Sequence, residues 1–139
     1  MTSRLTENAI DCADPTALAE FWCAVLGYQV HLVEDDGGFV EIGPQRSAEE
    51  HLEAVRRGPQ APAITFARVP EAKAGKNRVH LDVSPIDCTQ AEEVARLEAL
   101  GARRADVGQH PDSPWVVMTD PEGNEFCVLR SLAPGESSR

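Results

Sequence analysis

One short segment of the chain, Val79-His80-Leu81-Asp82-Val83, places an imidazole and a carboxylate two residues apart. An imidazole exchanges protons near neutral pH and binds transition metals, and a carboxylate can orient it, take up a proton or bind a metal itself. The alternation predicts a β-strand with His80 and Asp82 on one face and the three apolar residues on the other. A polar strand face needs a water-filled cavity or a polar partner, so the segment predicts part of a binding or catalytic site.

A second segment near the C-terminus alternates in the same way. In residues 125–129, Phe126 and Val128 share one predicted strand face, which leaves Glu125, Cys127 and Leu129 on the other. A carboxylate and a thiol on the polar face are further candidates for a metal or a proton.

Other candidate ligand-binding residues lie on neighbouring segments. Trp115 ends the proline-rich run 110–115, where it could stack on a ligand or anchor the core. Phe66 and Arg68 lie in a predicted strand and could line a cavity or simply pack, and Arg68 could meet an anionic group. Nothing in the sequence gathers ligands around His31 or His51, so we expect both at the surface.

The elements that position these residues form two copies of one unit. The first half predicts a strand over 5–12, a helix over 14–27, strands over 28–35 and 38–42, an inserted helix over 47–58 and a strand over 62–68. The second half predicts a strand over 79–83, a helix over 89–101 and strands over 102–107, 115–119 and 125–129. The repeat offset is 80 − 7 = 73 positions, which makes Glu7 the counterpart of His80. We therefore predict one α+β domain of two tandem βαβββ modules, over about 5–70 and 77–131, followed by a flexible tail at 132–139.

Composition narrows the function classes. The 139 residues include 13 Lys+Arg and 23 Asp+Glu, so the formal charge is 13 − 23 = −10. A phosphate backbone is bound by clustered cations, so nucleic acid is excluded as an expected partner. The sequence has no apolar run of about 18 residues and no apolar leader, so we expect a cytoplasmic protein with no membrane partner. The four cysteines form no Cys-x-x-Cys pair and are expected as reduced thiols.

The whole pattern resembles a known superfamily. The phrases Lys76 to Val83 and Trp115 to Leu129, with Asp11 to Pro15 and the Phe21-Trp22 to Gly27 helix, are similar to the vicinal oxygen chelate superfamily, in its branch of glyoxalases, bleomycin-resistance proteins and dioxygenases. The resemblance covers about residues 5 to 131. It implies that the two modules enclose a cup, and that metal-using members place a ligand on the first and last strand of each module.

Transferred residue by residue, that metal pattern is incomplete. Glu7 and His80 fall on ligand positions, Cys127 stands where the superfamily has Glu, and the fourth strand, residues 63–68, offers neither Glu nor His. A divalent metal (zinc, nickel or manganese) held by Glu7, His80 and Cys127 is one reading, with zinc accepting all three ligand types. The other is a metal-free floor on which His80 hydrogen-bonds to Glu7 or Asp82.

Two functions follow from the resemblance. One is a small-molecule binding protein or a lyase/isomerase that acts on a small carbonyl metabolite. In this function Glu7 would be the base and His80 the electrophile or a metal ligand. The residues expected around the substrate are Phe66, Arg68, Asp82, Trp115 and Glu125. The alternative is a metal-free protein that sequesters a drug or metabolite, for which an acidic cavity would favour a cationic compound. In both cases the partner is a small molecule, and a homodimer is expected, as is common in the superfamily.

Overall fold

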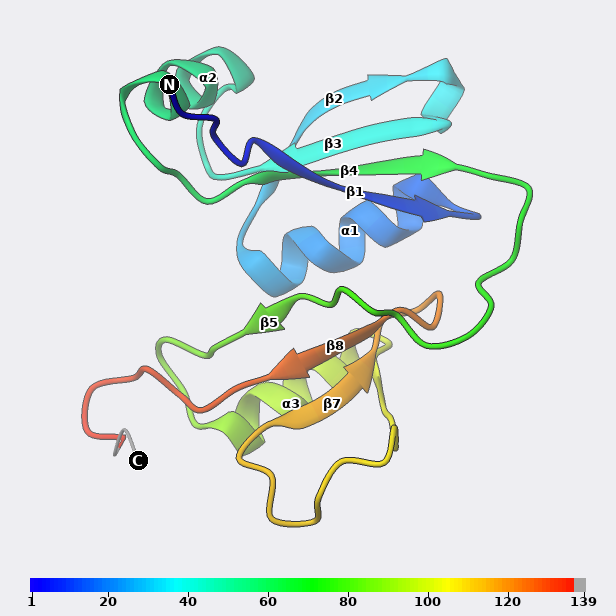
Figure 1. The fold of residues 1–139 in the computed structure, drawn as a ribbon, viewed down its shortest axis with the longest axis vertical. Coiled ribbons are helices and arrows are strands. Elements are labelled where there is room, and N and C mark those ends of the chain that lie inside the picture. The colour runs from blue at the N-terminus through cyan, green and yellow to red at the C-terminus, as the bar shows by residue number, and fades with distance from the viewer. Residues whose placement is uncertain (137–139) are drawn as a thin grey trace. The chain divides into compact units, whose positions relative to one another are not determined.

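The computed structural model describes residues 1–136 and divides into two compact units. Unit 1 is Met1–Ala72 and unit 2 is Lys73–Arg139 (Figure 1). Residues 137–139, the end of the predicted tail, lie outside the described residues. Each unit has its own four-stranded sheet. Within residues 1–136, no helix combines the length and the apolar character that crossing a bilayer requires.

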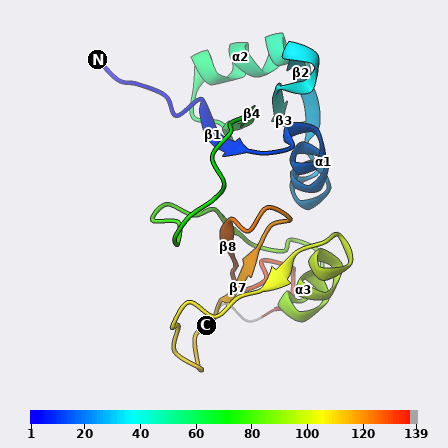
Figure 2. The same cartoon turned by 90° about the vertical axis from the view of Figure 1, so that its right-hand side faces the viewer.

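Unit 1 has a mixed sheet with the strand order β1-β4-β3-β2. Its strands are β1 (Glu7–Cys12), β2 (Gln29–Glu34), β3 (Phe39–Gly43) and β4 (Ala63–Arg68), and its helices are α1 (Pro15–Leu26), the short 3-10 turn η1 (Asp35–Gly37) and α2 (Ala48–Arg57). β1 runs parallel to β4, while the β4–β3 and β3–β2 pairs are antiparallel. The helices α1 and α2 lie on opposite sides of this sheet (Figures 1 and 2).

Local signals explain where these helices begin and end. The Asp14 side chain accepts a hydrogen bond from the Ala17 N–H at the start of α1, and Gly27 takes the left-handed conformation just after its end. Ser47 and Glu50 form a complete capping box at the start of α2. The predicted helix boundaries in unit 1 are therefore confirmed.

The core of unit 1 lies between its sheet and α1. Leu18 and Trp22 of α1 and Ile42 and Phe66 of the sheet are each at most 1% exposed. Phe66, for which lining a cavity and packing in the core were the two alternatives, is 0% exposed in this structure, which favours packing. Phe66 lies on β4, an inner strand of the sheet, and is buried in the core.

The histidines of unit 1 also differ from expectation. His51 is only 6% exposed, and the His31 side chain is 1% exposed. The prediction that both lie at the surface is wrong, because α2 folds over the sheet and brings His51 against His31 of β2. Their ring centres are 5.9 Å apart.

Unit 2 has the strand order β5-β8-β7-β6. Its elements are β5 (Asp82–Val83), α3 (Gln90–Ala99), β6 (Arg103–Arg104), β7 (Val116–Thr119) and β8 (Glu125–Val128). β5 runs parallel to β8, and the other two pairs are antiparallel. Thr89 and Glu92 form a complete capping box at the start of α3, as predicted.

Two strands of unit 2 are shorter than predicted. β5 keeps only residues 82–83 of the predicted 79–83, and β6 keeps only 103–104 of 102–107. Val79 is 85% exposed, so the apolar residue that suggested a longer strand packs on nothing. Parallel pairing still reaches Leu81, whose carbonyl accepts a hydrogen bond from the Cys127 N–H. The order of elements in the two units matches the predicted α+β fold of two tandem βαβββ modules.

Candidate functional site

Strand register places a polar cluster on one face of the unit 2 sheet. Asp82 of β5 pairs with Cys127 of β8, which in turn pairs with Val117 of β7. Paired residues on neighbouring strands share a face, so the three side chains lie side by side. The neighbouring residues Phe126 and Val128 are at most 1% exposed and pack in the core, although Phe126 also borders the cavity described below. The pairing of Cys127 with Asp82 agrees with the predicted polar face of the last strand.

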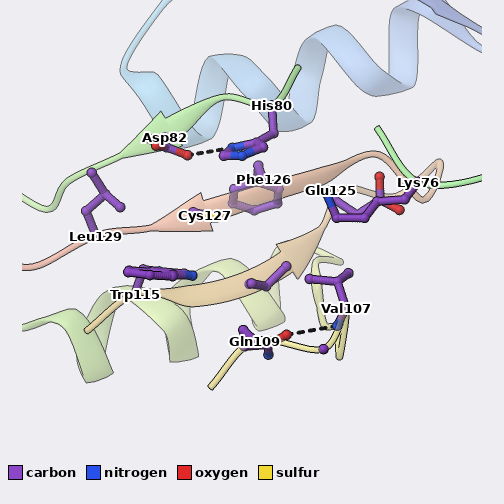
Figure 3. Close-up of a pocket in the computed structure, with 12 residues that line it drawn as sticks. Lys76, His80, Asp82, Val107, Gln109, Trp115, Glu125, Phe126, Cys127 and Leu129 are labelled. Atoms are coloured by element: carbon purple, nitrogen blue, oxygen red, sulfur yellow. Dashed lines mark hydrogen bonds and ion pairs between the residues drawn. The ribbon is translucent and has the colours of Figure 1, made fainter. Parts of the chain in front are cut away.

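This face forms the floor of a cavity of about 410 Å³ within unit 2. Figure 3 shows side chains from the segment before β5, from β8 and β7, and from the loop around Gln109 gathered around it. Its wall and floor are formed by Lys76, His80, Asp82, Val107, Gly108, Gln109, Trp115, Val117, Glu125, Phe126, Cys127 and Leu129. The volume suits a small metabolite.

His80, Asp82 and Cys127 form the chemical centre of this cavity. His80 Nδ1 lies 2.7 Å from Asp82 Oδ1 (Figure 3). One ligand-type atom from each of the three residues lies within 4.8 Å of the others. His80 and Asp82 are partly exposed, whereas Cys127 is 8% exposed. Burial raises the pKa of the Cys127 thiol, and the Asp82 charge and hydrogen bond raise it further.

The donor set of this cluster fits zinc. A thiolate, an imidazole and a carboxylate are all zinc ligands, and three protein ligands with an open fourth position are typical of catalytic zinc. Manganese prefers hard oxygen ligands, so a thiolate suits it poorly. Two of these three residues, His80 and Cys127, belong to the predicted metal set, whereas its third member, Glu7, belongs to unit 1.

Glu125 has a different environment from the cluster. Its carboxylate accepts hydrogen bonds from the Asn77 N–H at 2.9 Å and from Lys73 Nζ at 3.2 Å. Burial raises the pKa of the Glu125 carboxyl, but the hydrogen bonds from Asn77 and Lys73 and the Lys73 charge outweigh it, so the pKa is lowered. Glu125 holds the segment that leads into His80, and its charge is balanced by Lys73.

Trp115 and Lys76 complete the cavity wall from two sides. Trp115 is 41% exposed and presents a large aromatic surface to the cavity. Lys76 brings an ammonium group from the segment before His80. Sequence reasoning selected neither Lys76 nor Gln109 as a site residue. The Gln109 side chain bridges the Val107 N–H and the Ala105 carbonyl. No spacing pattern marks either residue, because the loop fold alone brings them to the cavity.

The remaining predicted site residues belong to unit 1. Glu7 is exposed at the start of β1, and Arg68 is exposed at the end of β4. The structure brings Asp82, Trp115, Glu125 and Cys127 together with His80. The pairing of Glu7 with His80 stays a prediction.

Two βαβββ modules in tandem, one with a polar cluster on its sheet, define the class of the protein as a vicinal oxygen chelate fold. The chain belongs to the glyoxalase-like family, because the family model described as Glyoxalase-like domain matches residues 7–129. A search of the curated proteins found no match.

Solved structures share this fold at low sequence identity. A glyoxalase/bleomycin resistance protein/dioxygenase family enzyme from Burkholderia phytofirmans is 20% identical, with 91% of this chain and 97% of that chain covered and a TM-score of 0.59. A possible glyoxalase from Bacillus cereus is 16% identical, with 92% and 99% covered and a TM-score of 0.58. A mutant of the fosfomycin resistance protein FosX from Listeria monocytogenes, complexed with Mn(II) and 1S,2S-dihydroxypropylphosphonic acid, is 12% identical, with 93% of each chain covered and a TM-score of 0.66. These similarities confirm the predicted fold.

Proposed function

We propose that the chain binds a small carbonyl metabolite in the unit 2 cavity and acts on it as a lyase or isomerase, with zinc held by His80, Asp82 and Cys127. The observation that carries this proposal is the convergence of three zinc-type ligands within 4.8 Å on the cavity floor. The FosX structure, which holds Mn(II) in the same fold, supports a metal-assisted reaction. Here the thiol changes the preferred ion.

The chain's own residues supply the proton chemistry. In the metal-free protein, the His80 Nδ1–H can donate to Asp82 Oδ1, which leaves the Nε2 lone pair free to take a proton. To hold zinc together with Asp82, Nδ1 would give up this proton and bind the ion itself. A zinc ion held here would polarise a carbonyl oxygen as a Lewis acid. The Asp82 carboxylate would stabilise His80 whenever the imidazole is protonated. The Lys76 ammonium group favours negative charge that develops on a substrate oxygen.

The aromatic and apolar wall would orient the substrate. Trp115 and Leu129 offer apolar surface for the carbon skeleton, and His80 and Asp82 offer polar groups. The predicted base, Glu7, is tested by a turnover assay on small carbonyl compounds. Glu7→Gln should abolish turnover if Glu7 removes the proton, and it should leave metal binding in unit 2 unchanged.

Cobalt binding tests the metal site directly. Chelator-treated protein titrated with Co²⁺ should develop the strong near-ultraviolet absorption of thiolate bound to cobalt. Cys127→Ser should abolish this absorption, whereas Cys88→Ser, which removes a thiol elsewhere in unit 2, should leave it unchanged. Absence of the band in the wild-type protein, or its persistence in Cys127→Ser, would contradict the site.

The second candidate is metal-free sequestration of a drug or metabolite. It is favoured by the Trp115 face on the cavity and by the Asp82 carboxylate, which together suit a cationic aromatic compound. A ligand that binds the folded state raises the unfolding temperature by mass action. Stabilisation by cationic aromatic compounds in the presence of chelator, lost in Trp115→Ala, would favour sequestration over metal chemistry. The expected homodimer stays a prediction.

A further inference from the structure

Unit 1 contains a second group of ligand-type side chains, on the side of its sheet covered by α2. His31 lies on β2, Glu41 on β3 and His51 on α2. These two strands and this helix all belong to unit 1, so the group is separate from the unit 2 cluster. In unit 1 the helix α2 lies between β3 and β4 and brings His51 over the sheet. In unit 2 the corresponding strands β7 and β8 follow each other without a helix.

His31 is fixed by the backbone around it. A register shift between Val30 and Leu32 makes it the extra residue of a β-bulge. Its ring lies directly over Gly43, where an added Cβ would be 2.3 Å from His31 Cε1. The Pro44 carbonyl lies 3.1 Å from His31 Nε2, and because a carbonyl only accepts, Nε2 carries the proton.

This hydrogen bond leaves a lone pair on His31 Nδ1. That atom has no hydrogen-bond partner and lies 3.6 Å from Glu41 Oε1, so two acceptors face each other when the imidazole is neutral, the form that binds a metal. A nitrogen and an oxygen bound to one zinc ion at a tetrahedral angle are about 3.3 Å apart, which is close to the separation observed. A backbone carbonyl on the far ring nitrogen is also the usual support for a metal-binding histidine.

His51, on the helix α2 that covers the sheet, is the third ligand-type side chain of this group. It is 6% exposed, and neither of its ring nitrogens has a hydrogen-bond partner, a costly state for a buried polar group. Its ring centre is 5.9 Å from that of His31. Two imidazoles on one zinc ion have ring centres about 5 Å apart at the tetrahedral angle and about 6.4 Å apart at most.

We propose that His31 Nδ1, Glu41 and His51 form a second divalent-metal site, of the two-histidine and one-carboxylate type, in unit 1. Among the described residues, only the His80 cluster has three ligand atoms that all lie within 4.8 Å of one another. The three ligand atoms in unit 1 are therefore further apart without a metal, and metal binding draws the His51 ring toward His31 and Glu41. The Glu41 side chain, 23% exposed, provides the entry path from solvent. The open coordination positions would be filled by water or by an oxygen ligand.

The test removes the unit 2 cluster first. In the full chain carrying His80→Ala and Cys127→Ser, calorimetric titration with Zn²⁺ should show one ion bound. Adding His51→Gln should weaken binding by more than the roughly 100-fold that loss of an outer-shell partner costs. Adding His110→Gln, which changes an exposed histidine of unit 2, should leave binding unchanged. No zinc binding in the double variant, or full binding in the presence of His51→Gln, would overturn the proposal.

Two further measurements keep the result independent of whether one variant folds. Histidine ring ¹⁵N spectra of the double variant should show zinc-dependent shifts for His31 and His51 and none for His110; shifts at His110 alone would overturn the proposal. Arg46 places a positive charge near His51, so Arg46→Gln should tighten zinc binding. A weaker affinity in Arg46→Gln would count against a cation at this position.

Discussion

At the residue scale, the clearest individual environment is that of Tyr28, the single tyrosine of the chain. Its hydroxyl donates to the Pro62 carbonyl at 3.0 Å. Burial raises the pKa of the phenol above its ordinary value of 10.0, and the Arg46 charge offsets only part of this. Because the folded-state pKa is the higher one, the stability from this group is complete below pH 10.0 and is lost as pH rises through the folded-state pKa.

Tyr28 can be titrated without interference from other tyrosines. We expect the phenolate absorbance of the native protein to rise at higher pH than that of the urea-unfolded protein. Tyr28→Phe should abolish the transition and cost about 1 kcal/mol of unfolding free energy at neutral pH. A native transition at or below the unfolded one would contradict the inferred environment.

Asp120 is a second residue with a defined structural task. It is 2% exposed and accepts hydrogen bonds from the backbone N–H groups of Glu122 and Asn124 in the turn before β8. Asp120→Ala should destabilise the protein by about 1–3 kcal/mol, because half-buried backbone donors lose their acceptor. Chemical denaturation measures this, with the exposed Asp112→Ala as a control expected within about 0.5 kcal/mol of wild type. Equal stability of the two variants would show that the turn does not depend on Asp120.

Single residues also show where sequence reasoning stopped. The polar face of His80, Asp82 and Cys127 could be predicted, because strand alternation and a parallel partner fix it. The burial of His31 and His51 could not, because it depends on how an inserted helix folds back over a sheet. No local pattern encodes that contact between residues 20 positions apart (51 − 31 = 20).

At the element scale, helices were more predictable than strands. The capping boxes at Ser47 and Thr89 mark where α2 and α3 begin, because the cap depends on residues three positions apart. The short strands β5 and β6 depend on partners far along the chain, so periodicity over 79–83 and 102–107 overstated their length.

The bulged strand β2 supports an element-scale prediction about Gly43. A methyl group at this position would collide with the His31 ring, so Gly43→Ala should destabilise the protein by about 1–3 kcal/mol. In a His31→Ala background the same change should cost much less, because the ring is gone. Denaturant unfolding of the four proteins of this cycle, with chelator present, gives the coupling energy. Additive effects would show that the ring does not occupy this space.

At the scale of the whole molecule, the charge of −10 governs behaviour in solution. The calculated isoelectric point is about 4.8, where repulsion between molecules is smallest. We expect the solubility minimum near this pH and little binding to polyanions at neutral pH. Turbidity measured across an acid pH series checks the first expectation. A solubility minimum well above pH 4.8 would point to bound cations or to association through a local surface patch.

The two units also carry one deeply buried thiol each. Cys12 of unit 1 is 4% exposed and Cys127 of unit 2 is 8% exposed. Cys127 also lines the open cavity of unit 2, so a thiol reagent can reach its sulfur in the native state, whereas the Cys12 sulfur can be reached only when unit 1 opens. A variant that keeps Cys12 and replaces the other three cysteines would therefore report local unfolding of unit 1, and one that keeps Cys127 alone would report access to the cavity. Labelling rates measured on the two variants would separate the opening of unit 1 from the filling of the unit 2 cavity by a ligand.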